Sequence, residues 1–162
     1  MTPANTELRP ATDAHFAWLL GGLCPDNLKL AEGGLETPEI LTMLRGIAAE
    51  LRDAIGAGAW LITAGTEVVG LISYMALPDQ HGRVEIGFGI AATCRRRGHV
   101  TRAVAALVAL SRAQGLAHCL TAETTVDNIG SQAALTRNGF TACHTRMTEE
   151  DGEVIGFHLT LD

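Results

Sequence analysis

A strand pattern that runs almost directly into a helix pattern is the feature that most constrains the fold of this chain. Apolar and other residues alternate strictly over residues 83–91, which predicts a strand with one buried face. Residues 98–114 carry apolar side chains at helical spacing, and Gly115 follows them as a helix-end residue. A strand and helix joined this closely are typical of a crossover unit, in which the helix packs back on the sheet.

The rest of the chain places this unit in a mixed α/β sheet. Asp151-Gly152 predicts a hairpin near the C-terminal end, and residues 21–36 are loop-like. Expected strands cover residues 7–10, 59–64, 67–77, 83–91, 116–123, 140–148 and 153–161. Expected helices begin after Thr12 or Asp13, after Thr37, at Gly98, and after Asp127 or Asn128. The predicted order is β-α-α-β-β-β-α-β-α-β-β, with helices on both faces of the sheet.

Composition limits the classes of protein to consider. A length of 162 residues with 47% hydrophobic residues predicts one globular domain over residues 1–162. A net charge of −6 argues against broad nucleic-acid binding, which needs a basic face. The N-terminus has no signal-peptide pattern, and the longest apolar run, residues 103–110, is far too short to cross a membrane. Four scattered cysteines and six scattered histidines suggest no disulfide framework and no metal site, so we expect a cytoplasmic protein.

The densest positive charge lies at the junction between this strand and helix. Arg95, Arg96 and Arg97 precede Gly98, at the expected start of the helix. A helix N-terminus offers free N–H donors and a partial positive charge, and arginine binds phosphate through paired hydrogen bonds. The junction therefore predicts a pyrophosphate site, although a solvated basic run is the alternative. The spacing matches neither a Walker loop nor a G-x-G-x-x-G turn.

The same residues resemble the signature Q/R-x-x-G-x-G/A of the GCN5-related N-acetyltransferase (GNAT) superfamily. Arg95 and Gly98 fill its first two defined positions, whereas Val100 replaces the usual Gly or Ala. The motif Asn128-Ile129-Gly130-Ser131, followed by Asn138-Gly139-Phe140, is similar to the branch of ribosomal-protein alanine acetyltransferases, and residues 8–13 resemble the start of the superfamily. This resemblance implies a mostly antiparallel twisted sheet of about seven strands.

It also implies acetyl-CoA as co-substrate, with no metal. The pantetheine arm would enter where the sheet splits and hydrogen-bond to the strand before the signature, with Ile90 as main-chain contact; Gly87 and Gly89 fit a bulge there. Expected coenzyme contacts are Phe88, Ile90, Arg95, Arg96, Arg97, Gly98, His99, Val100, Thr101 and Asn128. Two alternatives stay open. In one, Arg96 and Arg97 contribute only long-range electrostatic attraction to the phosphates without contacting them; in the other, the His99 side chain faces solvent instead of the coenzyme.

Acetyl transfer to an amine needs a proton acceptor, because an ammonium ion is not nucleophilic. Glu85 lies on the strand before the signature and is the expected base, acting through water. Pairing with Arg83 is the alternative structural role, and Glu123 or water alone is the alternative base.

The departing thiolate also needs a hydrogen-bond donor. Leu135 stands where many family members carry an acidic tyrosine, and the only tyrosine, Tyr74, is expected half-buried in a strand. The resemblance therefore implies Ser131 as the donor to the leaving sulfur. Asn128 is expected to cap the helix, to bind the pantetheine arm or a water, or both.

The predicted function is transfer of acetyl to a primary amine by direct attack in a ternary complex. A protein N-terminus or a small cationic amine suits the acidic residues before and at the second helix, Asp26, Glu32, Glu36 and Glu39. The alternative is a non-catalytic acyl-CoA sensor of the same fold. Neither nucleic acid nor a membrane is an expected partner, and such proteins often form homodimers. The acceptor, the acyl preference and the oligomeric state stay open.

Overall fold

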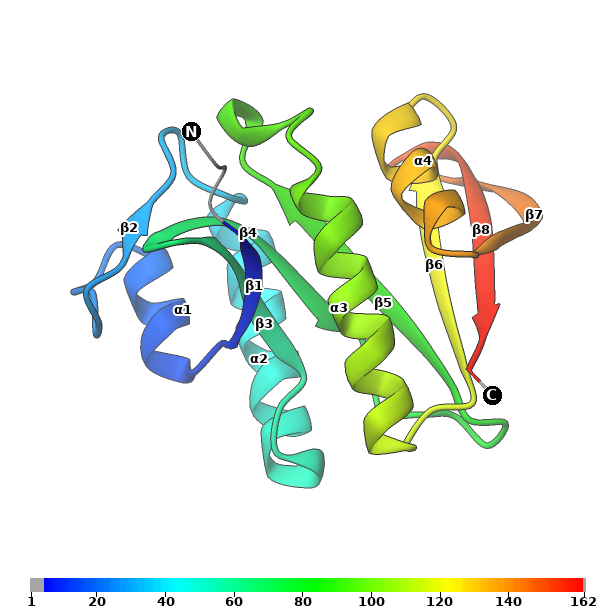
Figure 1. Cartoon of the computed structure of the whole chain (residues 1–162), viewed down its shortest axis with the longest axis horizontal. Helices are drawn as coiled ribbons and strands as arrows, with labels where there is room; N and C mark the ends of the chain where they lie inside the picture. The colour runs from blue at the N-terminus through cyan, green and yellow to red at the C-terminus, as the bar shows by residue number, and fades with distance from the viewer. Residues whose placement is uncertain (1–4, 162) are drawn as a thin grey trace.

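One twisted sheet runs through the described part of the chain, residues 5–161, in this computed structural model (Figure 1). Residues 1–4, on which part of the signal-peptide argument rests, and residue 162 lie outside the described residues. The strand order is β1-β3-β4-β5-β6-β8-β7, and β2 pairs with β4. The strands are β1 (Thr6–Pro10), β2 (Lys29–Leu30), β3 (Ala59–Ala64), β4 (Glu67–Tyr74), β5 (Arg83–Ile90), β6 (Cys119–Thr125), β7 (Thr141–Thr148) and β8 (Gly152–Thr160).

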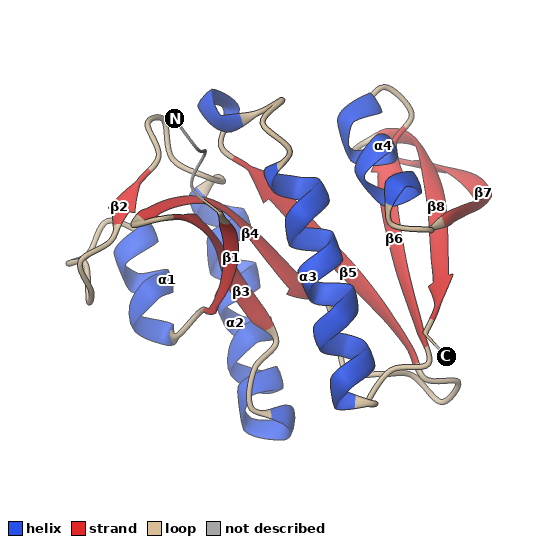
Figure 2. Cartoon of the chain, viewed as in Figure 1, coloured by secondary structure: helices blue, strands red, loops and turns tan. Residues whose placement is uncertain are grey.

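Helices cover both faces of the sheet, as the sequence predicts (Figure 2). They are α1 (Asp13–Leu19), α2 (Pro38–Ile55), α3 (His99–Gln114) and α4 (Ile129–Arg137), with a short 3-10 turn at Ala92–Cys94. α1 and α2 cover one face, where Phe16 and Leu41 pack on Leu61 of β3. α3 covers the other face, where Val104 and Leu107 belong to the larger core. Successive side chains of each strand point to opposite faces, so a single sheet contributes apolar side chains to two core layers.

α1 and α2 begin at the capping residues that the sequence predicts. Thr12 caps α1, and its hydroxyl accepts a hydrogen bond from the His15 backbone N–H at 3.2 Å. Thr37 caps α2 in the same way, and Pro38 occupies the first helical position. The mixed, mostly antiparallel sheet is confirmed, and so is the expected element order apart from one additional short strand, β2.

The expected elements differ from the structure most at three places, each of which follows from how the strands pair and turn. The loop-like region 21–36 contains β2, two residues held by parallel pairing with β4. The strand expected to end at residue 77 ends at Tyr74, opposite Ile86, because the chain then turns toward β5. β6 begins at Cys119 rather than residue 116, where it meets Arg83 of β5.

β5 and β6 separate along their length, which is the feature of the fold that creates a site. They pair in parallel only at the starts of both strands, and the last paired residues are Glu85 and Thr121. Beyond that point β5 pairs with β4 alone, and β6 pairs with β8 alone. The sheet therefore opens in its middle, with α3 beside β5 and α4 over β6 (Figure 1).

Tyr74 is a core residue rather than a half-buried one. Its side chain is 2% exposed, packs edge-on against Trp60, and its hydroxyl lies 2.5 Å from the hydroxyl of Ser111 on α3. Burial raises the pKa of the Tyr74 phenol. This tyrosine therefore links the sheet to α3 and is not available as an acid.

We expect Tyr74→Phe to lower the free energy of unfolding by about 1–2 kcal/mol, because the buried Ser111 hydroxyl loses its partner. Urea unfolding measures this change. Any enzymatic turnover of the variant should match that of the wild type at a temperature where both are folded, and a clear loss of turnover would contradict a purely structural role.

Candidate active site

A cavity of about 1070 Å³ occupies the opening between the end of β5 and the segment that follows β6, from Asp127 into α4. We call it the gap cavity. Leu35 and Glu36 line it from the loop before α2, on one side of the sheet. Thr101 of α3 and Ser131 of α4 line it from the other side. The sheet is therefore open from face to face at this point.

The main chain of β5 offers hydrogen-bonding groups to the gap cavity. The Glu85 carbonyl accepts from the Met75 N–H at 2.8 Å, and the Ala91 N–H donates to the Val69 carbonyl at 2.7 Å, so these residues face β4. In an antiparallel ladder the intervening residues direct their groups the other way. The N–H and C=O groups of Phe88 and Ile90 therefore point into the opening, where an extended ligand can pair with them.

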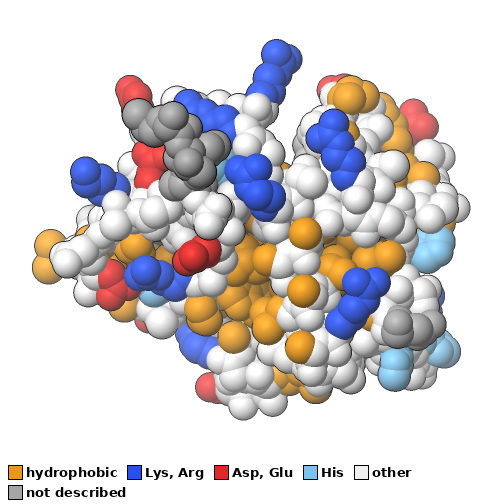
Figure 3. Space-filling model, viewed as in Figure 1, with side chains coloured by type: hydrophobic (Ala, Val, Ile, Leu, Met, Phe, Trp, Pro, Cys, Tyr) orange, Lys and Arg blue, Asp and Glu red, His pale blue; other side chains and the backbone are white. Residues whose placement is uncertain are grey.

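The loop between β5 and α3 wraps around the helix N-terminus. Arg96 has φ 65° and Gly98 has φ 80°, so two left-handed residues curl the chain back on itself. The first backbone hydrogen bond of α3 runs from the Arg102 N–H to the Gly98 carbonyl, and no side chain among residues 5–161 caps the helix. The preceding N–H groups are thus open to an anion. Positive side chains lie around the notch between this loop and α4 in Figure 3.

Most of the residues expected to bind the coenzyme line this one cavity. They are Phe88, Ile90, Arg95, Arg96, Gly98, His99, Val100, Thr101 and Asn128, together with Ser131. Arg97 does not line it: this residue supplies only its carbonyl, which accepts from Arg102 at 2.9 Å. Its expected place as a direct contact is therefore not supported by the geometry.

His99 is buried rather than facing solvent. Its Nδ1 lies 2.9 Å from the hydroxyl of Thr6 on β1, and Arg102 donates to the same hydroxyl at 2.8 Å. Burial, then the positive charges of Arg102 and Arg97, lower the pKa of the His99 imidazole. A neutral His99 thus fixes α3 to β1 while it lines the cavity wall.

Asn128 and Ser131 shape the α4 side of the gap cavity. The Asn128 side-chain oxygen accepts from the Ser131 backbone N–H at 3.2 Å, which confirms Asn128 as a helix cap. Asn138, at the end of α4, donates to the carbonyls of Thr101 and Ala134 at 3.0 and 2.8 Å. The Asn138 side chain therefore holds α3 and α4, the two helical walls, together.

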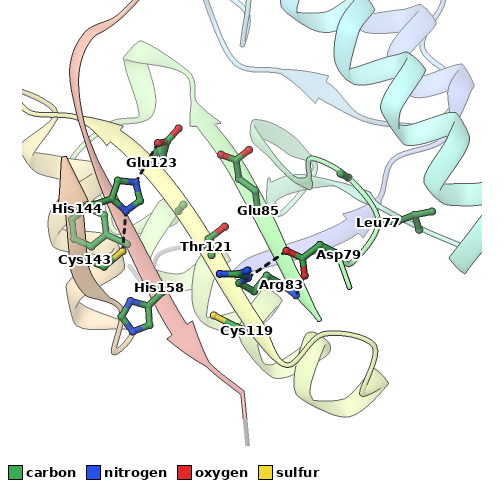
Figure 4. A pocket seen from close by; sticks show the side chains of 13 residues that line it. Leu77, Asp79, Arg83, Glu85, Cys119, Thr121, Glu123, Cys143, His144 and His158 are labelled. Atoms are coloured by element: carbon green, nitrogen blue, oxygen red, sulfur yellow. Dashed lines mark hydrogen bonds and ion pairs between the residues drawn. The ribbon is translucent and has the colours of Figure 1, made fainter. Parts of the chain in front are cut away.

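The Glu85 side chain lines a second cavity of about 690 Å³, which we call the lateral cavity (Figure 4). Partial desolvation and the nearby charge of Glu123 raise the pKa of the Glu85 carboxyl. Arg83 pairs with Asp79 at 3.3 Å, so the alternative in which Glu85 is held by Arg83 is wrong.

Glu123, the alternative base, faces the same lateral cavity. Arg146 contacts it through two hydrogen bonds of 2.6 and 2.7 Å, and these lower the pKa of the Glu123 carboxyl. His144 turns toward this carboxylate, with 3.7 Å between Nε2 and Oε2. A carboxylate neutralised in this way is a weaker proton acceptor than Glu85.

The lining residues of the gap cavity that were not predicted as coenzyme or catalytic residues include Arg137 and Glu36. Arg137 follows Gly130 and Ala134 on one face of α4, and this helical spacing was the available signal. Glu36 was expected only as one of several acidic residues suited to a cationic acceptor. Its place beside Gly89 of β5 depends on how the long loop before α2 folds back.

Two further observations concern the described residues only. No helix between residues 5 and 161 is both long and apolar enough to cross a bilayer. Within the same range, no group of three or more His, Cys, Asp or Glu side chains is arranged to hold a metal ion.

Comparison with known proteins identifies the class of this fold. The acetyltransferase (GNAT) domain family matches residues 5–141. The chain belongs to this family, and the resemblance drawn from its sequence is confirmed.

Particular relatives agree with that assignment. The uncharacterized N-acetyltransferase YjdG of Bacillus subtilis is 30% identical over 108 residues, which are 65% of this chain and 64% of that protein. The match thus spans less than two thirds of that relative.

Solved structures agree in fold. The ribosomal L7/L12 α-N-protein acetyltransferase RimL, in complex with coenzyme A, has a TM-score of 0.73 at 20% identity, covering 97% of this chain and 94% of RimL. The ribosomal-protein-S5-alanine acetyltransferase from Vibrio fischeri has a TM-score of 0.74 at 16% identity, covering 100% and 98% of the two chains.

Proposed function

We propose that this protein transfers the acetyl group of acetyl-CoA to a primary amine, by direct attack in a ternary complex. One observation carries the proposal: a single cavity joins the exposed main chain of Phe88 and Ile90 to the open N-terminus of α3 and to Arg95. This arrangement suits a ligand with an extended amide-containing arm and a pyrophosphate.

Each part of the cavity has a task in this proposal. The α3 N–H groups, Gly98 and Arg95 hold the pyrophosphate, and the main chain of β5 pairs with the pantetheine arm. The Ile90 N–H stabilises the negative charge that develops on the thioester oxygen. Ser131 donates a hydrogen bond to the departing sulfur from the opposite wall. Two carboxylates on the α2 side of β5, Glu85 and Glu36, are candidates to receive the amine proton.

The proposed acceptor is a protein N-terminus or a small cationic amine. It enters from the side of α1 and α2, because α3 and α4 cover the other face of the opening. The lateral cavity lies on the entry side and has room for a short peptide or small amine. Of the acidic residues expected to attract a cation, Asp26 is already engaged by His15 at 2.7 Å and Arg9 at 3.6 Å. Glu36 is the one that reaches β5.

A thiol-release assay tests the function. The purified chain is mixed with acetyl-CoA and each of four acceptor classes: peptides with free N-termini, polyamines, aminoglycosides and acidic amines. Release of free coenzyme A with at least one class, and acetylated product by mass spectrometry, supports the proposal. Coenzyme binding without thiol release in every case would favour the non-catalytic acyl-CoA sensor instead.

We expect Ser131→Ala to lower kcat about three- to tenfold, the range of one ordinary hydrogen bond. The Michaelis constant for acetyl-CoA should change little, because the bond forms as the sulfur leaves. Thr136→Ala, an exposed change on the same helix, is the matched control. Equal kcat in Ser131→Ala and the wild type would remove the hydroxyl from the mechanism.

A further inference from the structure

The Glu36 carboxylate lies directly against the β5 backbone. Its Oε1 is 2.5 Å from the position that a Cβ atom on Gly89 would take. The carboxylate can lie there only because Gly89 has no side chain. Glu36 immediately precedes Thr37, the N-cap residue of α2, so the start of that helix fixes its backbone in place.

Glu36 has no charged partner in the described part of the chain, and its carboxylate makes no side-chain hydrogen bond there. This distinguishes it from Glu123 and Asp79, which are each paired with an arginine. The residue remains open to solvent, as a group that meets an incoming substrate must be. Partial desolvation raises the pKa of the Glu36 carboxyl above its ordinary value. A carboxylate with these properties is suited to bind an ammonium group.

The position of Glu36 relative to Ile90 indicates that the ammonium group bound there is the one of the acceptor amine. Ile90 directs its main chain into the opening, and Gly89 is the adjacent residue. In the proposed function the thioester carbonyl lies at the Ile90 N–H, and the amine approaches from the α2 side. Glu36 lines the gap cavity on that side. In the proposed function its carboxylate therefore meets the amine close to the reacting carbon.

Glu85 is less well placed for direct contact. Glu85 and Gly89 share one face of β5, but four residues of a strand span about 13 Å. Met75 lies between them, because a Cβ on Gly87 would meet its sulfur at 2.8 Å. Glu85 lines the lateral cavity and not the gap cavity. It therefore faces a more distant part of the acceptor.

We propose that Glu36 is the catalytic carboxylate that binds the acceptor ammonium and takes its proton. This inference rests on the proposed function and names the proton acceptor within it. The freed nitrogen lone pair forms the C–N bond to the thioester carbonyl carbon. The C–S bond breaks, and its electron pair leaves with the coenzyme A thiolate. The first proton leaves nitrogen before the attack and passes to Glu36, which returns it to solvent. The second leaves nitrogen as the amide forms and, through water, protonates the coenzyme A thiolate.

The pH profile of kcat/KM gives a sharp test. An enzyme whose base is Glu36 uses the protonated amine, so kcat/KM rises through the raised pKa of Glu36. It then stays level up to the acceptor pKa, near about 10.4 for a lysine-like amine. Without this base only the neutral amine reacts. The profile of Glu36→Gln should then climb about tenfold per pH unit up to the acceptor pKa.

We therefore compare the wild type with Glu36→Gln, Glu85→Gln and Glu50→Gln, using the best acceptor from the thiol-release assay. Glu36→Gln should lower kcat by about a hundredfold at neutral pH, replace the plateau by a slope, and leave acetyl-CoA affinity unchanged by calorimetry. Glu50→Gln removes the same charge from an exposed site further along α2, outside both cavities, and should behave as the wild type. Glu85→Gln should raise KM for the acceptor but keep the plateau.

The outcomes separate this inference from the function on which it rests. If the wild type releases thiol and Glu36→Gln keeps the plateau, Glu36 is not the proton acceptor although the enzyme is an acetyltransferase. Loss of the plateau in Glu85→Gln would transfer the role to Glu85. If the wild type binds acetyl-CoA but releases no thiol with any acceptor class, the proposed function fails, and this inference fails with it.

Discussion

Arg95→Ala is expected to weaken coenzyme A binding by about ten- to a hundredfold. A hydrogen bond between a guanidinium and a phosphate contributes about 1.5–3 kcal/mol, which corresponds to that range. Arg95 is exposed and lines the gap cavity at the end of the 3-10 turn, so its loss should leave the fold intact. Isothermal titration calorimetry with coenzyme A measures the change directly, with no need for an acceptor.

Arg97→Ala is the matched control for this measurement. The substitution removes the same charge two residues further on, but Arg97 contributes a carbonyl to its surroundings and no side chain to the cavity wall. We expect coenzyme affinity within about threefold of the wild type, because an exposed charge acts only through a screened field. Equal losses in both variants would mean that the triplet works as a field and that Arg95 has no specific contact. Arg95→Lys should restore part of the affinity, since lysine keeps the charge but not the paired geometry.

The strand–loop–helix unit from β5 to α3 was predictable because its information is local. Alternation along residues 83–91 defined the two faces of β5, and Gly98 marked the start of α3. Asn128 could be expected at the start of α4, because a capping side chain bonds to a residue three positions away. Contacts between residues this close in sequence leave a readable pattern.

The parts of the site that were missed depend on long-range packing. Alternation gives the face of β5 on which Glu85 lies, but not which of two cavities opens there. The burial of His99 depends on Thr6, a residue 93 positions earlier in the chain. Glu36 meets Gly89 because a loop of irregular sequence folds across the sheet. The spacing of apolar and polar residues in the sequence encodes none of these three features.

Leu107→Ala is expected to lower the free energy of unfolding by about 2–5 kcal/mol. Leu107 is fully buried in the core beneath α3, so the substitution leaves a cavity that well-packed neighbours fill only in part. Urea unfolding followed by circular dichroism measures the change. The matched control is Leu110→Ala on the same helix, where the side chain is only partly buried and the expected loss is less than half as large.

Coenzyme A should stabilise Leu107→Ala and the wild type by the same increment at a given free concentration. Leu107 lies on the second half of α3 and does not line the gap cavity, whereas the helix N-terminus does. A ligand that binds only the folded state adds a stabilisation set by its concentration and its dissociation constant alone. Equal increments would show that the folded variant keeps its phosphate site, so that the core beneath α3 contributes stability and the first turn contributes binding. A smaller increment in the variant would instead show that packing at Leu107 sets the position of the α3 N-terminus.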